Sequence, residues 1–341
     1  MGAVHDVIEQ HGKQAALLAF LDRREVEAAA AYMADEDAGI GFLYSGWCQA
    51  ALPHKKLPDD QVWQIRSDYV NMLVAPGHRS SDSGPAKVVG VPYGSRARLI
   101  MFYVQSEALR TNSREVSLGR SMNHWLHRMG VPLGGKSIAS IKDQADRIGR
   151  CTFTFDGKAL KAGTLNRMTI FDKAIFADLD AVPGQGSLFP QVAKLSEQFF
   201  KQLTDHPVPL DEAAVRAISN NSMALDLYAW LSYRLHVLKV ATPISWTALK
   251  AQFGVGFESG FHFRAHFKDN LRLALAVYRD AKVDVTERGL DLHPSPPPIA
   301  PRIVAIGRVP GAARNRIAGP ATAENLAPTR DLVLSLPSRH R

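Results

Sequence analysis

The chain has 341 residues and a formal net charge of +8 at pH 7, with 46% hydrophobic and 22% charged residues. This composition excludes a disordered or fibrous protein, and the length predicts about two domains. Two cysteines exclude a disulfide scaffold and a cysteine-rich zinc module, and no apolar run approaches the roughly 20 residues that cross a bilayer. We therefore expect a soluble, cytoplasmic protein that does not bind a membrane. The excess of basic residues makes nucleic acid the first candidate partner.

The positive charge is unevenly distributed along the chain. From Ile299 onward there are seven arginines and only two acids, so this tail holds more than half of the net charge. The tail is also rich in Pro, Ala and Gly, a composition that predicts disorder. The rest of the chain is only mildly basic, so charge alone argues weakly for DNA binding.

The first half begins with a predicted helical segment and continues into two strands, Tyr69–Ala75 and Lys87–Val91, with a loop rich in Gly, Ser and Pro between them. From Gly94 onward the pattern predicts helix, helix, turn, helix and β-hairpin. These elements are expected at Ser95–Leu109, Leu118–Met129, Gly130–Gly135, Ser137–Ile148, and the strands Cys151–Phe155 and Leu165–Phe171. This is the order of a winged helix-turn-helix.

A similar order recurs in the second half. Helices are predicted at Met223–Leu238, Trp246–Phe253 and Phe263–Tyr278, followed by a hairpin around Thr286–Gly289. We therefore predict an α+β fold, mostly α, with tandem winged helix-turn-helix domains that carry β-hairpin wings. The predicted divisions are an N-terminal helical segment (1–40), a first winged-helix domain with a preceding β-hairpin (41–182), a linker helix with a second winged-helix domain (183–293) and a Pro- and Arg-rich disordered tail (294–341).

The third helix of each domain is the candidate reader of double-stranded DNA, because a major groove admits one helix. In the first domain one side of this helix is apolar, with Ile138, Ile141, Ala145 and Ile148, and the opposite side is polar. On that polar side Asp143 would repel phosphates unless it pairs with Arg147 one turn on or accepts from a cytosine amine. A solvated face of mixed charge is the alternative interpretation. The candidate DNA-binding residues of the whole chain are Lys136, Ser140, Arg147, Arg150, Lys158, Lys161, Arg167, His262, Lys268 and Arg272.

Other motifs do not favour an enzyme. Gly130–Ser137 reads GVPLGGKS and matches the P-loop pattern, but a P-loop needs a buried strand before it, and the preceding residues are predicted to be helical. His262 and His266 have a metal-compatible spacing but lack two further ligands. We expect no catalytic activity, no cofactor and no metal.

Three blocks of the sequence resemble the plasmid-encoded RepA-type replication initiators of Gram-negative bacteria. The blocks are Tyr44–Lys56, Val91–Thr111 and Ser113–Gly130 with Gly134–Lys136, and the resemblance runs from about residue 41 to residue 155. It implies an initiator of theta-type plasmid replication that binds origin repeats, recruits host replication proteins and often represses its own promoter. It also implies that no nucleotide is needed and no strand is cut.

Two other functions remain open from the sequence. One is a winged-helix transcriptional regulator without an origin function, and the other is a P-loop nucleotide-binding enzyme. Both a monomer and a homodimer are compatible with the initiator role. The roles of four basic residues within the resembling blocks are also open, because such residues can serve packing as well as binding: Arg96, Arg98, Arg120 and Lys136.

Overall fold

A computed structural model describes residues 3–35, 38–67, 70–81, 84–157, 166–172 and 192–299. The helices are α1 (Ala3–Ala19), α2 (Arg23–Met33), α3 (Ser45–Gln49), α4 (Gly94–Arg110), α5 (Met122–Arg128), α6 (Gly135–Arg150), α7 (Glu197–Asp205), α8 (Glu212–Ala217), α9 (Ser222–Arg234), α10 (Trp246–Phe253) and α11 (Gly260–Ala276). The strands are β1 (Ile40–Tyr44), β2 (Trp63–Arg66), β3 (Val70–Ala75), β4 (Gly77–Arg79), β5 (Lys87–Val89), β6 (Glu115–Ser117), β7 (Thr152–Gly157), β8 (Asn166–Met168), β9 (Val192–Lys194), β10 (Pro207–Asp211), β11 (Thr242–Ser245), β12 (Val283–Val285) and β13 (Gly289–Leu292). No helix in these ranges has the length and apolar character of a membrane span.

The first half is built around α4, which is buried along most of its length, and α6 packs against it. An antiparallel sheet in the order β2-β3-β7-β8 lies beside these helices. Val70, Met72 and Val74 alternate along β3 with less buried residues, as expected of a half-buried strand. The indole of Trp47 from α3 packs edge-on against the rings of Phe153 and Phe155, with centroids 5.3 and 5.0 Å away.

The expected hairpin before the first three-helix unit differs from the one observed. Tyr69–Ala75 and Lys87–Val91 do not pair with each other. Instead β3 pairs with β2 and β7, and β5 pairs with β4, which lies in the segment expected to be a loop. The difference arises because the chain carries on past β3 into a second, separate hairpin.

The second half follows the predicted order closely. It runs α9, β11, α10, α11, β12, β13, and its antiparallel sheet has the order β11-β13-β12. Phe263, Phe267 and Leu271 form the buried side of α11, and Thr286 Oγ1 lies 3.2 Å from the amide nitrogen of Gly289, closing the hairpin turn. The predicted third helix and the predicted hairpin are therefore confirmed here.

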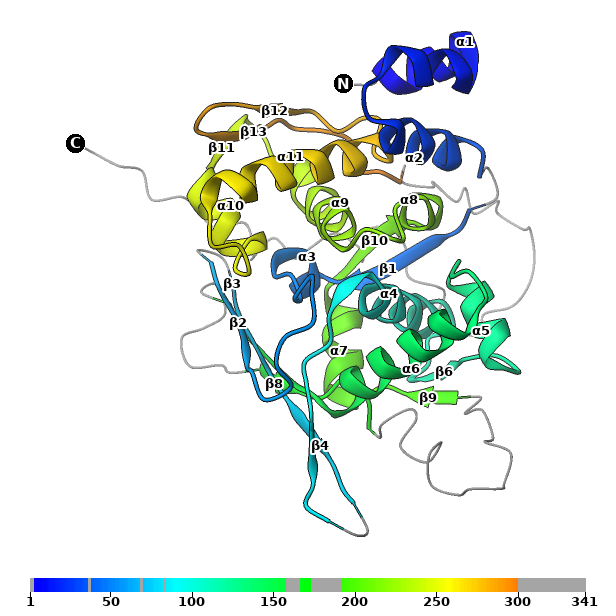
Figure 1. The fold of residues 1–341 in the computed structure, drawn as a ribbon, viewed down its shortest axis with the longest axis vertical. Coiled ribbons are helices and arrows are strands. Elements are labelled where there is room, and N and C mark those ends of the chain that lie inside the picture. The colour runs from blue at the N-terminus through cyan, green and yellow to red at the C-terminus, as the bar shows by residue number, and fades with distance from the viewer. Residues whose placement is uncertain are drawn as a thin grey trace, which may run out of the picture.

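The two halves are joined by a small sheet of distant strands. β1 pairs antiparallel with β10, from Ile40 opposite Asp211 to Tyr44 opposite Pro207, and α4 packs on β1 (Figure 1). One apolar core continues through both halves. The predicted boundary at 182/183 lies outside the described residues, so the domain division stays a prediction. Most of the tail also lies outside the described residues, so its predicted disorder stays a prediction as well.

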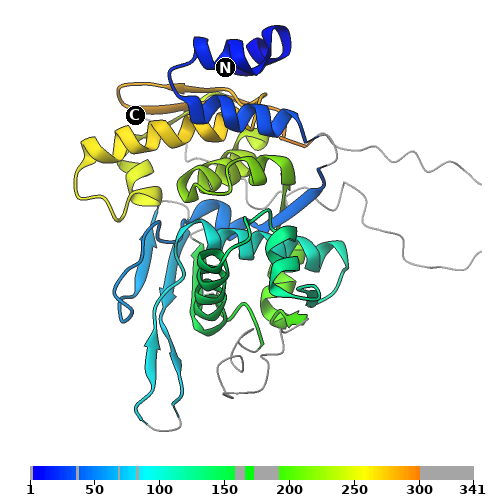
Figure 2. The ribbon, with the colours of Figure 1, turned by 45° about the vertical axis from the view of Figure 1, so that its right-hand side comes forward.

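The N-terminal segment forms two helices. α2 packs against α8 and α11, and α1 lies across α2 at the edge of the molecule (Figures 1 and 2). His5 anchors α1 through Nε2, which lies 2.8 Å from the carbonyl oxygen of Ala276, and the guanidinium of Arg279 pairs with the carboxylates of Asp6 and Glu9. The predicted helical segment therefore belongs structurally to the second half.

Candidate nucleic-acid interface

The open surface of α6 is confined to its N-terminal half. Lys136, Lys142 and Asp143 are exposed and Ser140 is half-buried, whereas Ile141 and the apolar positions after it face α4. The N-terminal part of a helix-turn-helix reading helix is the part that reaches base edges. Lys142 was missed by the sequence analysis, because a helical projection centred on Lys136 places it toward the margin of the polar side.

Arg147 does not lie on an open surface. Its side chain is only 6% exposed, because the loop around Asp59 and the backbone at Val91 cover this end of the helix. Nε donates to both carboxylate oxygens of Asp143 at 3.0 Å, and a terminal nitrogen donates to Asp59 at 3.1 Å. The structure shows the pair with Asp143, one of the two alternatives for that carboxylate, and a side chain buried in this way does not fit the expected contact of Arg147 with a base.

Arg150 is likewise occupied within the protein. Its Nε donates to Asp146 at 2.6 Å, and a terminal nitrogen donates to the carbonyl oxygen of His78 on β4 at 3.1 Å. Arg79 of β4 pairs with the same Asp146 at 2.6 Å. The expected phosphate contact by Arg150 does not fit this geometry, because its guanidinium holds the β4–β5 hairpin against α6.

The expected wing contacts are only partly visible. Lys158 and Lys161 lie outside the described residues. Arg167 lies in β8 opposite Thr154 of β7, as expected for a hairpin, and only its backbone is described.

In the second half the exposed basic residues follow the N-terminal part of α11. His262 and Lys268 are exposed, as expected. The ammonium of Lys268 and the guanidinium of Arg264 lie 5.6 and 5.9 Å from the ring centre of Trp246. An open hollow between α10 and α11 is lined by Trp246, Arg264 and Lys250. Arg264 and Lys250 were missed by the sequence analysis, although both are cations on helices, Arg264 exposed and Lys250 half-buried.

Arg272 is farther from this cluster. Its guanidinium pairs with the carboxylate of Asp269, one turn earlier on α11. Both residues face the start of α2, where Asp22 and Glu25 add negative charge close to Arg272. Since α2 packs beside this part of α11, the accessible portion of the helix is its N-terminal half.

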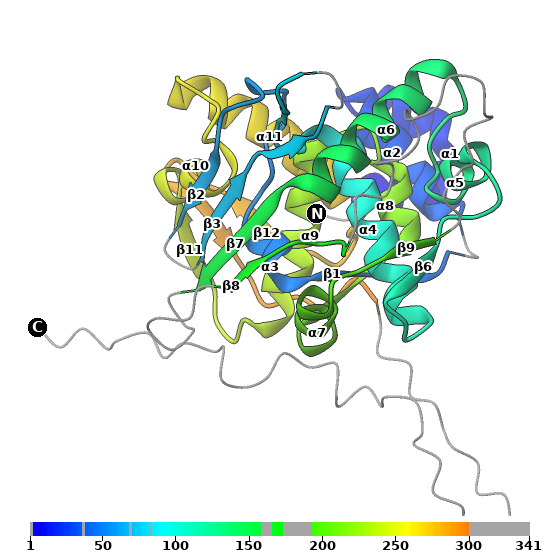
Figure 3. The ribbon, with the colours of Figure 1, turned by 90° about the horizontal axis from the view of Figure 1, so that it is seen from below.

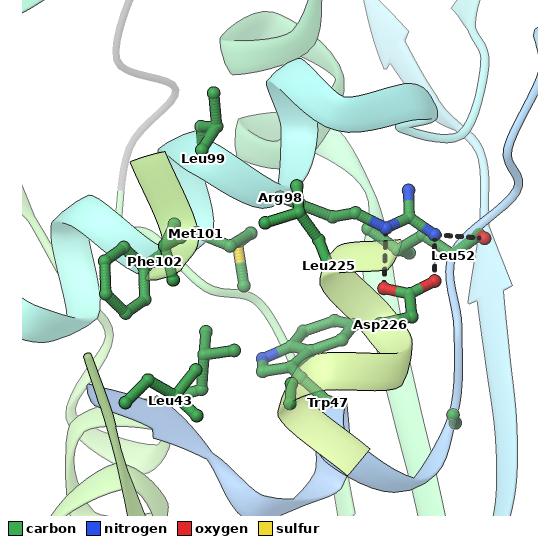
Figure 4. A pocket seen from close by; sticks show the side chains of 13 residues that line it. Leu43, Trp47, Leu52, Arg98, Leu99, Met101, Phe102, Leu225 and Asp226 are labelled. Atoms are coloured by element: carbon green, nitrogen blue, oxygen red, sulfur yellow. Dashed lines mark hydrogen bonds and ion pairs between the residues drawn. The ribbon is translucent and has the colours of Figure 1, made fainter. Parts of the chain in front are cut away.

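A buried ion pair joins the two units (Figure 4). Arg98 of α4 donates to both carboxylate oxygens of Asp226 on α9 at 2.6 Å, and to the carbonyl oxygens of Leu52 at 2.7 Å and Gly94 at 2.8 Å. In Figure 4 the pair borders an apolar pocket that contains Trp47. Arg98, from one of the resembling blocks, therefore serves packing between the halves.

His54 lies beside this ion pair. Its Nδ1 is 3.0 Å from the hydroxyl of Ser222, and its Nε2 is 3.3 Å from the carbonyl oxygen of Phe253, the last residue of α10. Burial, reinforced by the charge of Arg98, lowers the pKa of His54 to about 3. A neutral imidazole thus connects the first half to the α10–α11 corner.

The P-loop motif has a different structural role. Gly130–Ser137 links α5 to the start of α6, and a helix rather than a strand precedes it. Lys136 therefore opens a helix on the surface instead of facing a phosphate cradle. Within the described ranges no group of three or more His, Cys, Asp or Glu side chains is arranged to hold a metal ion.

The fold and the site together define an α+β protein with two consecutive pairs of helices, α5–α6 and α10–α11, each followed by a β-hairpin. Residues 91–247 match the RepA_C family model, described as plasmid encoded RepA protein. The resemblance to RepA-type replication initiators is thereby confirmed.

The other comparisons found distant similarity. No curated protein matches the chain. The chain resembles a crystal structure of selenomethionine derivatives of domains 2 and 3 of RctB, with a TM-score of 0.45, 13% identity, and coverage of 73% of this chain and 97% of that one. A second crystal structure, of RctB domains 2-3, gives a TM-score of 0.44, 13% identity, and coverage of 72% and 95%.

Proposed function

We propose that the protein is a plasmid replication initiator that binds repeated double-stranded DNA sites at the origin. The observation that carries this proposal is the family match over residues 91–247. The initiator role includes recruitment of host replication proteins and repression of its own promoter, and the active form is either a monomer or a homodimer. The protein acts by binding, without a cofactor, a metal or strand cleavage.

Within this proposal, two winged-helix units bind the DNA. The element order α9–β11–α10–α11–β12–β13 agrees with a winged helix, and the order α4–α5–α6–β7–β8 agrees with a second one. The N-terminal halves of α6 and α11 face the major groove in successive segments of one site. In this arrangement Lys136 and Lys142 contact phosphates.

The acidic residues on both helices do not oppose this arrangement. Asp143 is paired with Arg147 on α6, and Asp269 is paired with Arg272 on α11. Each carboxylate is neutralised within its own helix, so repulsion of the DNA backbone is weakened. The electrostatic potential at the accessible N-terminal half of each helix is therefore set by its basic residues that are not paired with a described carboxylate. These are Lys136 and Lys142 on α6, and Arg264 and Lys268 on α11.

Footprinting on the DNA that flanks the gene tests the proposal. We expect protection of several repeats beside an AT-rich segment. Protection of a single promoter operator would favour a transcriptional regulator, and the absence of sequence-specific protection would overturn DNA-site binding.

A paired variant tests the contact surface. Lys136→Ala with Lys142→Ala should weaken binding to every repeat and lower the slope of log affinity against log salt by about two, because two phosphate contacts are lost. Lys13→Ala is the control, since Lys13 is exposed on α1 at the other end of the molecule (Figure 2). An unchanged salt slope in the paired variant would remove α6 from the interface.

A further inference from the structure

The hairpin of β4 and β5 extends away from the rest of the molecule. We call residues 76–90 the β-arm, of which 76–81 and 84–90 are described. Figure 2 shows it projecting from the first half, on the side opposite α1. From His78 to Val88 every described residue is exposed, so these residues add little to the apolar core. A projecting segment of this kind is positioned to contact another molecule.

The base of the β-arm is fixed rigidly to the C-terminal half of α6. Asp146 accepts from Arg79 of the arm and from Arg150 of the helix, both at 2.6 Å, and its side chain is only 8% exposed. Gly77 approaches the helix so closely that a Cβ atom there would lie 2.3 Å from the carbonyl oxygen of Arg150. The ion-paired base therefore sets the direction of the arm relative to α6.

The thiol of Cys151 marks the same junction. Cys151 directly follows α6, is fully buried, and lies with its Sγ 3.6 Å from the carbonyl oxygen of Gly90 at the end of the arm. Because the arm covers this thiol, its reactivity reports whether the arm is seated on the helix.

The paired part of the β-arm carries basic groups. Lys87 is exposed and makes no ion pair with any described residue, and it lies opposite Arg79 in the register of the hairpin. His78 is exposed on the same strand as Arg79. Because Arg79 is already paired with Asp146, the basic side chains of the arm that face outside molecules are Lys87 and His78. Such a hairpin suits an anionic surface that runs past the end of α6.

We infer that the β-arm is a DNA-contact element in its own right, which lies on the phosphate backbone of duplex DNA flanking the segment that α6 faces. Lys87 and His78 supply the contacts to phosphate oxygens. Arg147 and Arg150, expected from the sequence to touch DNA, instead hold the arm and its supporting loop in place. This inference rests on the proposed function, because it needs α6 to face DNA.

Hydroxyl-radical footprinting of two arm variants on the origin repeats tests the inference. The first is Lys87→Ala with His78→Ala. The second replaces residues 80–86 by Asn-Gly, which joins the paired Arg79 and Lys87 by a two-residue hairpin turn. The first should lose protection at one flank of each repeat, keep protection at its centre, and bind roughly tenfold more weakly, the equivalent of about 1.4 kcal/mol. The second keeps His78 and Lys87 in the paired part of the arm, so it should keep protection at both the flank and the centre. Lys13→Ala is the matched control.

A third variant moves the arm without removing it. Gly77→Ala should displace the arm from α6, with the same loss of flank protection, while the thiol of Cys151 becomes reactive in the folded protein. Circular dichroism and the urea midpoint establish that the variants are folded. In the shortened-arm variant Cys151 should stay protected, because the base is intact.

The outcomes separate the inference from the proposed function. Unchanged flank protection in the folded Lys87→Ala with His78→Ala variant and in the folded Gly77→Ala variant would overturn the β-arm as a DNA contact and leave the initiator role intact. No protection by the wild-type protein at any repeat would overturn both. A change in sedimentation that accompanies unchanged footprints would assign the arm to contact between copies of the chain, which also contradicts the inference.

Discussion

Replacing Asp226 by Asn tests the join between the two halves most directly. The carboxylate of Asp226 is 10% exposed and the guanidinium of Arg98 is 8% exposed, so neither group is solvated by bulk water. The substitution removes the charge but little volume, and it leaves Arg98 buried without its counter-ion. Breaking one side of a buried pair costs about 3–5 kcal/mol. Since domains of this kind are stable by only about 5–15 kcal/mol, the loss is a large share of the total.

Urea unfolding followed by tryptophan fluorescence measures this loss. The matched control is Glu27→Gln, which breaks the pair of Arg23 and Glu27 on α2, whose side chains are 78% and 47% exposed. The control should change the free energy of unfolding by no more than about 0.5 kcal/mol.

A double substitution separates charge from packing. Arg98→Met with Asp226→Leu replaces both partners by apolar groups of similar size, and should recover most of the stability that Asp226→Asn loses. If Asp226→Asn costs less than about 1 kcal/mol, or no more than the control does, then Arg98 is not held as an uncompensated buried charge and our account of the join is wrong.

Three further predictions concern other buried groups. Because the pKa of His54 is lowered to about 3 by burial and by Arg98, the unfolded chain takes up a proton that the folded protein does not. Stability should be full above about pH 6.5 and fall by up to about 1.4 kcal/mol per pH unit below it, and His54→Gln should flatten this part of the urea-midpoint profile. Burial raises the pKa of Cys151 to about 12 and also that of Cys48, so neither thiol should react with a disulfide reagent until the protein unfolds, and fast labelling of the native protein would contradict this. Arg147→Ala should lower stability by about 1–3 kcal/mol with no change in DNA sequence preference, and a relaxed preference at one base pair would restore Arg147 as a reader.

Local patterns in the sequence predict the second half well. The spacing of Phe263, Phe267 and Leu271 defines α11, and the turn residues from Thr286 to Gly289 define the β12–β13 hairpin. These features depend on residues only a few positions apart, so periodicity and turn chemistry contain the necessary information.

Features that depend on distant residues were not predicted. A helical projection places Arg147 on the polar side of its helix, but it contains no information on Asp59, which covers that end from 88 residues away along the chain. The same holds for the buried role of Arg98, whose partner lies 128 residues away. Composition also assigned the start of the β-arm to a loop, because Gly77 and the serines after Arg79 are typical of turns.

The pairing of β1 with β10 has a consequence for synthesis of the protein on the ribosome. The strand that contains Tyr44 cannot pair until the ribosome has synthesised Pro207. At a synthesis rate of about 5–20 residues per second, this delay is roughly ten to thirty seconds. During this time the nascent N-terminal portion carries an unsatisfied strand edge and an uncovered apolar face of α4. Such a chain is a natural client for ribosome-associated chaperones, and premature termination before residue 207 would release an aggregation-prone fragment rather than a shorter working protein.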